Sequence, residues 1–520
     1  MENLKDKTLA ALFWNLSERV GVQIIQFIPT VVLARLLSPE QFGLIGMLSL
    51  FIAVANASLE GGFSTALIQK KEATYVDECS VFYYNLFIGG CLALVLFLAA
   101  PWIAAFYRQP VLTALTRVLT LQIIINAFGV VQTARLTRRL DFKTQLKAHL
   151  CATLASGIVG MAAAYGGWGV WSLAAQSIAK SLLGVATLWV ICDWRPGLVF
   201  SMASLKGMFG FGSRMYLSTL VSVFFENLHQ AFIGKVFSAG ALGQYTRAAS
   251  IKQIAVDTTS NTVGRVMYPA LASIQQDAAR LQRAYRKSIL LATFVHFPMM
   301  AGLIVLAKPL VNLLFGAKWG HCAVLLQLMC GAGYLYPLQL INLHILKVKG
   351  RSDLFLRLEV IKRVMILASL LFTYRWGISA ILIGQIAISG IGYFLNSYYS
   401  ERLIDYPMRK QMLDILPASV FSCLMSLGML GFAAVVKPAG YLVSMVLQTV
   451  VGTTIYLLLH RITRSESLHE MVLLARIRRD PATCTRPANP AAPDDCTTSL
   501  YRACPATARP PGESAESALP

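Results

Sequence analysis

Long apolar runs recur along the first 460 residues, and no other feature constrains the fold as strongly. Each run is about as long as the ~20 residues that an α-helix needs to cross the roughly 30 Å hydrocarbon core of a bilayer. Strands would give shorter segments that alternate with a period of two. The sequence therefore predicts an all-α polytopic membrane protein with about 14 transmembrane helices. The expected spans are residues 9–36, 42–66, 80–106, 112–134, 144–165, 168–191, 208–234, 240–266, 288–315, 323–346, 354–373, 377–398, 412–435 and 439–459.

The number and placement of the charged residues agree with this prediction. They make up 14% of the chain, against roughly 25% in soluble proteins, while 56% of the residues are hydrophobic. The net charge of +21 comes mainly from Lys and Arg in alternate connections between the spans: Lys70, Lys71, Arg135, Arg138, Arg139, Lys143, Arg195, Lys206, Arg280, Arg283, Arg286, Lys287, Lys347, Lys349, Arg351, Arg402, Arg409, Lys410, Arg461 and Arg464. The opposite connections hold few: Arg108, Lys235, Lys318, Arg375 and Lys437. This positive-inside bias predicts cytoplasmic termini, and no basic stripe with interleaved aromatics suggests nucleic acid as a partner.

Motifs for catalysis or metal binding are not found in the sequence. The ten cysteines show no C-x-x-C or zinc spacing, and there is no P-loop, so we expect no metal and no cofactor. The outer connections 37–41, 107–111 and 374–376 are very short. They leave little room for the extracytoplasmic domain that a membrane glycosyltransferase or polymerase usually needs. A transporter is therefore favoured over an enzyme.

An internal repeat indicates how the helices are organised. Arg35, two hydrophobic residues, Ser38 and Gly43 recur 200 residues later as Lys235, two hydrophobic residues, Ser238 and Gly243. Repeated halves with a site between them are typical of secondary transporters, although apolar helix ends can also resemble one another by chance. We expect two six-helix lobes in a parallel pseudo-repeat, two added helices and a largely disordered cytoplasmic tail, at residues 1–200, 201–402, 403–462 and 463–520.

Polar residues inside the spans predict a hydrated cavity, because ionisable groups are costly in a membrane. One helical stripe of the first span carries Asn15, Arg19, Gln23, Gln26 and Thr30, and one of the seventh span carries Arg214, Ser218, Ser222, Glu226 and His229. The alternative for the uncharged members is hydrogen bonding between packed helices. The predicted cavity residues are Arg19, Gln23, Gln26, Lys180, Arg214, Glu226, Arg247 and Lys252. Their cations outnumber their carboxylates, which suits an anionic substrate such as a phosphate.

Three intramembrane carboxylates are candidates for binding a coupling ion: Glu18, Glu226 and Asp257. Each could take up Na⁺ or H⁺, and each could instead pair with a neighbouring cation. The sequence does not distinguish these two roles.

Several short segments give the chain a family resemblance through their order and spacing. They are residues 33–43, 66–70, 138–143, 242–245, 268–272 and 314–316 together with Trp319. Over roughly residues 5–460 the chain resembles bacterial polysaccharide flippases of the polysaccharide transport family, the Wzx-type exporters. This family lies in the multidrug/oligosaccharidyl-lipid/polysaccharide superfamily. The resemblance implies two lobes around a central cavity and alternating access, but it names no catalytic residue.

The resemblance also implies a function. The expected activity is export of undecaprenyl-diphosphate-linked oligosaccharide repeat units across the bacterial inner membrane, with glycosyltransferases and a polymerase of the same pathway as possible partners. The alternatives in the same superfamily are a lipid II-type flippase and a multidrug/cation antiporter. A drug antiporter should have an acidic and aromatic cavity for its cationic substrates, whereas the cations inside these spans favour a lipid diphosphate.

Overall fold

The computed structural model describes residues 25–436 and 440–479, without the side chains of residues 260–266, 269 and 473–479. These residues form helices and turns and no strand, so the predicted all-α fold is confirmed. The helices of residues 25–200, here called the first half, are Ile25–Leu36, α2 (Pro39–Glu60), α3 (Phe63–Gln69), α4 (Tyr75–Tyr107), α5 (Val111–Ala127), α6 (Val130–Arg138), α7 (Phe142–Tyr165) and α8 (Val170–Ile191). Those of residues 201–404, the second half, are α9 (Met202–Val236), α10 (Ala239–Val256), α11 (Thr262–Ser273), α12 (Ala278–Leu314), α13 (Gly320–Gly333), α14 (Tyr336–Val348), α15 (Ser352–Thr373) and α16 (Ile378–Ile404). Then follow α17 (Met408–Val435), α18 (Tyr441–Ile462) and α19 (Glu466–Arg479).

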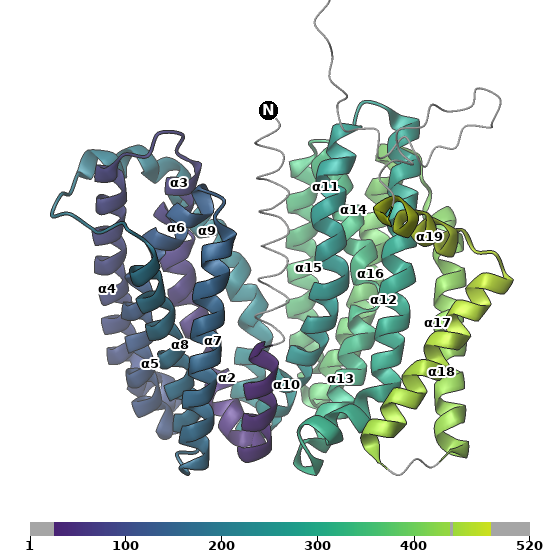
Figure 1. The fold of residues 1–520 in the computed structure, drawn as a ribbon, viewed down its shortest axis with the longest axis horizontal. Helices are drawn as coiled ribbons and strands as arrows, with labels where there is room; N and C mark the ends of the chain where they lie inside the picture. Colours follow the sequence, from purple (N-terminus) through teal and green to yellow (C-terminus); the bar gives the residue numbers. More distant parts are fainter. Residues whose placement is uncertain (1–24, 437–439, 480–520) are drawn as a thin grey trace, which may run out of the picture.

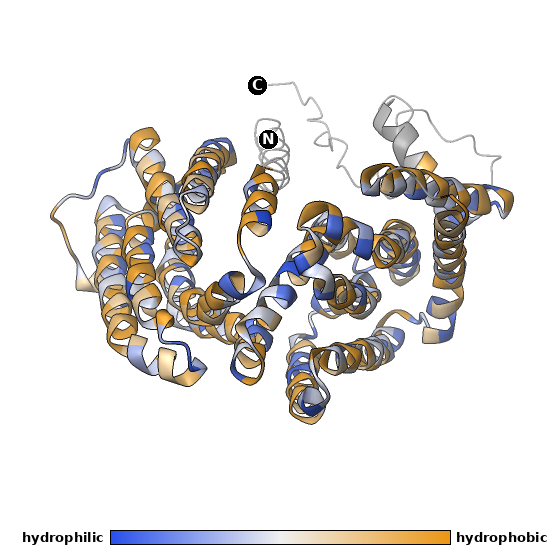
Figure 2. Cartoon of the chain, turned by 90° about the horizontal axis from the view of Figure 1, so that it is seen from below, coloured by the Kyte–Doolittle hydropathy of each residue, from blue (hydrophilic) through white to orange (hydrophobic). Residues whose placement is uncertain are grey.

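The helices stand roughly side by side in two groups, one of α2–α9 and one of α11–α19, with α10 between them (Figure 1). Within the described part of the chain, nine helical segments are long and apolar enough to cross a membrane, and the bent pair α5 and α6 gives a tenth. Apolar residues dominate the outer helices of both groups (Figure 2). The chain is therefore a multi-pass membrane protein, and the count of fourteen spans stays a prediction. Helices α9 and α15 carry several charged residues, and α10 carries Arg247 and Lys252 together with many small and polar residues, which makes all three less apolar.

The two halves are interrupted at matching places. In the first half, Gly61 and Gly62 separate α2 from α3, and Phe128 and Gly129 separate α5 from α6. In the second half, a π-helical turn at Asp257–Asn261 joins α10 to α11, and a two-residue break separates α13 from α14. The second and fourth helices of both halves are thus broken, as expected for a parallel repeat.

The recurring glycines form a reciprocal contact between the halves. A Cβ atom added to Gly43 would lie 1.7 Å from the carbonyl oxygen of Ala239, and one added to Gly243 would lie 1.8 Å from that of Pro39. The first turns of α2 and α10 therefore touch backbone to backbone, which only glycine allows. Ser38 and Ser238 are the N-caps of these two helices, and each side chain accepts a backbone N–H from the first turn.

The recurring basic residues cross to the opposite half. Arg35 donates through Nε to the carbonyl oxygen of Leu314 at the end of α12, over 2.9 Å. Lys235 donates to the carbonyl oxygen of Phe106 in the last turn of α4, and its ammonium group lies 4.3 Å from the centre of the Phe106 ring. Each basic side chain thus meets the carbonyl end of the third helix of the other half, where positive charge is stabilising.

These contacts close one end of the molecule, here called the seal, which comprises Arg35, Phe42, Gly43, Lys235, Gly243, Lys318 and Trp319. Lys318 donates to the carbonyl oxygens of Arg35 and Leu37, over 2.7 Å each. Trp319 is fully buried, and its Nε1 donates to the carbonyl oxygen of Ala34 over 2.9 Å. The seal lies at the end where the sequence has few Lys and Arg residues.

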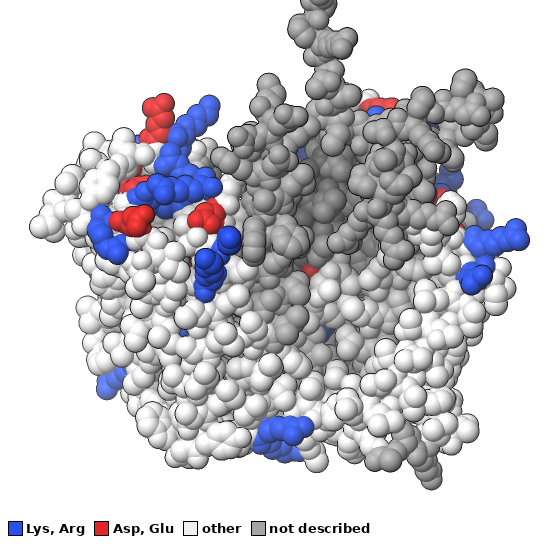
Figure 3. Space-filling view, in the orientation of Figure 1, with Lys and Arg blue, Asp and Glu red and all other residues white. Residues whose placement is uncertain are grey.

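At the opposite end, here called the basic end, several Lys and Arg side chains gather together with acidic ones on the face shown in Figure 3. Lys70 pairs with Asp77 over 2.6 Å, and Arg135 pairs with Glu78 over 3.1 Å. Both carboxylates belong to the first turn of α4 and are largely buried, so these pairs fasten the connections on either side to that helix.

Helix α9 joins the halves along its length. It belongs to the second half by sequence, yet it packs along α2 of the first half and lies in the same group in Figure 1. Ser49 donates to Gln230 over 2.9 Å, and the hydroxyls of Ser58 and Tyr216 are 3.2 Å apart. The division into lobes at residue 200 therefore stays a prediction.

The interior of the second half is filled by a network of buried polar side chains. Asn342 accepts hydrogen bonds from Tyr285 and from Ser400, the latter over 2.7 Å, and donates to Ser397 over 3.3 Å. Gln411 of α17 accepts from Ser397 over 3.3 Å. All of these side chains are buried, so α12, α14, α16 and α17 are held together through hydrogen bonds as well as apolar contacts.

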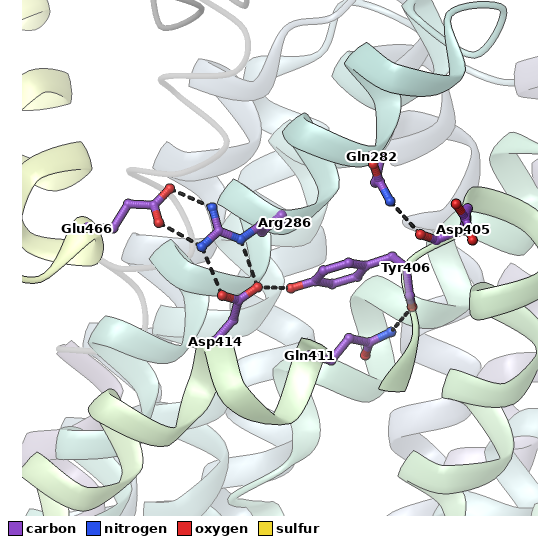
Figure 4. Close-up of polar contacts among 7 residues, drawn as sticks. All are labelled: Gln282, Arg286, Asp405, Tyr406, Gln411, Asp414 and Glu466. Carbon is purple, nitrogen blue, oxygen red and sulfur yellow. Dashed lines mark hydrogen bonds and ion pairs between the residues drawn. The ribbon is translucent and has the colours of Figure 1, made fainter. Parts of the chain in front are cut away.

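The network continues to the basic end (Figure 4). Gln411 donates to the backbone of Tyr406 over 3.2 Å, and the hydroxyl of Tyr406 donates to Asp414. Arg286 of α12 bonds Asp414 through two nitrogens and bonds Glu466 of α19 in the same way. The segment predicted as a tail from residue 463 thus begins with a docked helix, while residues 480–520 lie outside the described residues.

Candidate substrate cavity

A large cavity lies in the first half and is closed on one side by α10. Its volume is about 1430 Å³. The lining comes from Ile25–Leu36, α2, α3, α5, α6, α7, α8 and α10, with Gln230 of α9 and Phe315 added. At 1.5 Å per residue, Arg247 lies about 6 Å along α10 from Gly243 of the seal, and Glu60 lies roughly 25 Å along α2 from Gly43. The cavity therefore extends from the seal towards the basic end.

Amides and hydroxyls make up most of the polar lining: Gln26, Thr30, Ser49, Ser64, Gln122, Asn126, Thr133, Thr137, Thr153, Ser156, Gln176, Ser177, Ser181, Gln230, Thr246, Ser250 and Gln253. Two of them, Ser64 and Thr153, are buried, and their hydroxyl oxygens have no hydrogen-bond partner among the described residues. Buried hydroxyls are normally paired. The cavity thus offers free hydrogen-bonding groups of the kind that sugar hydroxyls can satisfy.

Two cations face the cavity from different walls. Lys180 of α8 donates to Gln26 Oε1 over 3.3 Å, and both residues line the cavity. Their role in substrate binding stays a prediction. Arg247 of α10 lines the cavity near the seal, and its guanidinium carbon lies 4.6 Å from the centre of the Phe42 ring. Neither cation has an ion-pair partner within the described ranges. Lys180 is exposed to the cavity and Arg247 is half-buried. Cations on a cavity wall without counterions among the described residues suit an anionic ligand.

Two ionisable residues of the lining were missed by sequence reasoning. Glu60, next to the Gly61–Gly62 break, is the one carboxylate among the described residues that line the cavity, and His149 of α7 lies on the same lining. The two side chains are close enough for the imidazole to influence the carboxylate electrostatically. Glu60 lies near the end of the predicted span 42–66, where a charge could equally face the membrane surface. The Gly-Gly pair that follows was the one signal of an interrupted helix.

Four predicted residues do not line this cavity. Arg214 and Glu226 are exposed on α9, and the Arg214 guanidinium donates to the carbonyl oxygen of Gly210 over 2.9 Å. Lys252 is half-buried on α10 with its chain near Gly333. Asp257, in the turn between α10 and α11, accepts a hydrogen bond from Gln253 over 3.0 Å. Their functional roles stay predictions, and Glu18, Arg19 and Gln23 lie outside the described residues.

Together the broken helix pairs, the reciprocal seal and the polar cavity define a polytopic membrane protein of the transporter class. The model of the family described as "Polysaccharide biosynthesis protein" matches residues 32–324, more than half of the chain. The chain belongs to this family, and the predicted resemblance is confirmed.

Individual relatives agree with this assignment. The chain is 25% identical to the lipopolysaccharide biosynthesis protein WzxC of Escherichia coli (strain K12) over 417 residues, which cover 79% of this chain and 82% of WzxC. It is 27% identical to the teichuronic acid biosynthesis protein TuaB of Bacillus subtilis (strain 168) over 357 residues, 68% of this chain and 74% of TuaB.

Solved structures show the same fold. The lipid II flippase MurJ in an inward closed conformation superposes with a TM-score of 0.72 at 13% identity, covering 87% of this chain and 98% of MurJ. An inward-facing multidrug resistance transporter of the MATE family superposes with a TM-score of 0.59 at 17% identity, covering 74% and 98%. At these identities the likeness concerns the fold alone.

Proposed function

We propose that the protein is a flippase that moves undecaprenyl-diphosphate-linked oligosaccharide repeat units across the bacterial inner membrane for cell-surface polysaccharide biosynthesis. The basic end faces the cytoplasm, as do both termini, and the seal faces the periplasm. Family membership and the names of the relatives support a role in polysaccharide export. Glycosyltransferases and a polymerase of the same pathway are the expected partners.

The composition of the cavity is the observation that carries this proposal. Its volume of about 1430 Å³ exceeds the roughly 300–1,000 Å³ that is typical of sites for drug-sized ligands. Its amides and hydroxyls match sugar hydroxyls, while Lys180 and Arg247 match a diphosphate. A multidrug/cation antiporter would need predominantly negative charge at this place, and a single carboxylate lines the described cavity.

In the proposed mechanism, polar and charged side chains of the cavity replace the water that the headgroup loses when it leaves the cytoplasmic surface. The sugars and the diphosphate enter the cavity from the basic end while the prenyl chain stays in lipid. Lys180, oriented by Gln26, attracts the diphosphate more strongly than it would in bulk water, because Coulomb attraction rises as the effective dielectric falls. Opening of the seal and closure of the basic end then expose the headgroup to the periplasm. Coupling to H⁺ or Na⁺ belongs to this proposal, with Glu60 as the carboxylate on the cavity wall.

The test is transport of a fluorescent undecaprenyl-diphosphate oligosaccharide in proteoliposomes, with polysaccharide export and membrane protein level measured in cells. We expect Lys180→Gln to reduce transport about tenfold, the effect of ~1.4 kcal/mol of lost binding. Lys147→Gln is the matched control, because Lys147 is an exposed residue of α7 that does not line the cavity. Unchanged transport by Lys180→Gln, or transport of cationic drugs in place of the lipid, would contradict the proposal.

A further inference from the structure

Arg247 is held in an unusual environment for a cation. It lies on α10 at the cavity wall, and its Nε is buried without a hydrogen-bond partner among the described residues. Its guanidinium carbon lies over the face of the Phe42 ring, 4.6 Å from the ring centre. The ring face is electron-rich and attracts the guanidinium. The Arg247 guanidinium is therefore attracted to the Phe42 ring of the seal. It has no anionic partner within the described part of the chain, so an anion that enters the cavity can bind to it.

Phe42 belongs to an aromatic stack that crosses the seal. Its ring meets Trp319 edge to face, with centroids 5.6 Å apart, and Trp319 meets Phe315 at 5.7 Å. Phe42 comes from the first half, whereas Trp319 and Phe315 come from the second half. The indole N–H of Trp319 returns to the first half through the carbonyl oxygen of Ala34. If the halves separate at this end, the contact between Phe42 and Trp319 and the hydrogen bond from Trp319 to Ala34 must break.

The same face of α10 also holds the segment that carries Trp319. Gln244, three residues before Arg247, donates to the carbonyl oxygen of Lys318 over 3.0 Å and accepts from the backbone N–H of Cys322 over 2.9 Å. Residues three apart lie on one helix face. A displacement of Arg247 is thus transmitted to Phe42 directly and to Trp319 through α10.

We propose that Arg247 is the residue through which headgroup binding loosens the seal. An anionic group bound to the guanidinium places negative charge beside the Phe42 ring, which weakens the attraction between Arg247 and that ring. Phe42 and Trp319 are then free to separate, so the occupied protein opens at the seal more readily than the empty one. This inference rests on the proposed function, because it assumes that an anionic lipid headgroup enters the cavity.

The test measures the distance across the seal in the full-length protein. Spin labels are placed at Ala114→Cys in the first half and Arg375→Cys in the second half, both exposed positions near this end, in a cysteine-free background reconstituted in lipid nanodiscs. The probe is undecaprenyl diphosphate, and undecaprenol is its uncharged control. Binding of radiolabelled undecaprenyl diphosphate is measured on the same samples.

In the otherwise unaltered protein, we expect undecaprenyl diphosphate to raise the ratio of long to short distances about threefold to tenfold, and undecaprenol to leave it unchanged. Arg247→Gln should abolish this response. Phe42→Leu should show long distances without the probe, because the ring that Arg247 holds is gone. Phe27→Leu is the matched control, since Phe27 also lines the cavity, whereas Arg247 lies over the ring of Phe42.

The outcomes separate this inference from the proposed function. If the protein does not bind undecaprenyl diphosphate, the proposed function is wrong, and the inference falls with it. If the lipid binds but the distance does not change, or if Arg247→Gln responds like the parent protein, the inference alone is wrong. The same holds if Phe42→Leu and Phe27→Leu behave alike.

Discussion

The two halves share one plan but differ in what fills them. Both have broken second and fourth helices, a serine N-cap, a glycine contact and a basic residue that reaches across the seal. The first half encloses a cavity in which two buried hydroxyls, Ser64 Oγ and Thr153 Oγ1, have no partner in the described part of the chain. In the second half, the side chains around Asn342 bond one another instead. The repeated features form the seal and the helix breaks, whereas the cavity is lined mainly by the first half, with α10 of the second half as one wall.

The largest effect is expected where the halves are most alike. Gly43→Ala and Gly243→Ala should each nearly abolish export, because a Cβ atom would lie under 2 Å from a backbone oxygen of the other half. That oxygen cannot move aside without shifting the helix, so the sealed state is lost. Gly240→Ala is the matched control, since the nearest atom to its added Cβ is 3.9 Å away. Export and membrane protein level are measured together, and equal export from all three variants would contradict a required close contact.

The sequence predicted these repeated features well because they depend on short-range chemistry. The recurrence of Arg35, Ser38 and Gly43 as Lys235, Ser238 and Gly243 identified the residues that build the seal, although their partners could not be derived. Those partners, such as Leu314 and Phe106, are backbone carbonyls far away in sequence, and any residue type supplies a carbonyl.

The cavity was predicted only in part. Gln26, Lys180 and Arg247 were expected because a cation or amide inside an apolar run needs a polar partner. Glu60 and His149 were missed because their neighbourhood depends on where α2 breaks and how α7 is rotated, and both are set by packing between helices. The same limit explains why the second-half network around Asn342 was not foreseen, since its members are dispersed over four helices.

The second prediction contrasts a buried polar residue from each half. Asn342→Ala removes the acceptor of the Tyr285 hydroxyl inside the second half, and a buried group left unpaired costs about 1–3 kcal/mol. We therefore expect a clear drop in the apparent melting temperature of the purified protein and a lower membrane level. Export per molecule should change little, because Asn342 does not line the cavity. An unchanged melting temperature would show that the network does not stabilise the second half.

Thr153→Val is the counterpart in the first half and should act in the opposite way. The hydroxyl has no partner within the ranges that the structure describes, so its replacement by a methyl group should leave the melting temperature unchanged or slightly higher. Export should fall about threefold to tenfold, the effect of roughly one lost hydrogen bond to the headgroup. If Thr153→Val instead lowers stability and leaves export intact, the unpaired hydroxyls do not serve the substrate.

The smallest effect is expected at the basic end of the second half, where α19 is docked. Arg286 bonds Asp414 and Glu466, but the Glu466 side chain is 44% exposed, whereas that of Asp414 is 17% exposed. Water and salt screen the outer pair, so Glu466→Gln should cost under about 1 kcal/mol. Asp414→Asn should cost more, because it weakens the inner pair and changes the group that accepts the Tyr406 hydroxyl. Thermal unfolding in low and high salt measures both: the Glu466→Gln difference should shrink as salt rises, and the Asp414→Asn difference should persist. If both variants lose the same stability, and salt reduces both losses, then water screens the Arg286–Asp414 pair as much as the Arg286–Glu466 pair. The buried polar network of the second half would then not extend to α19.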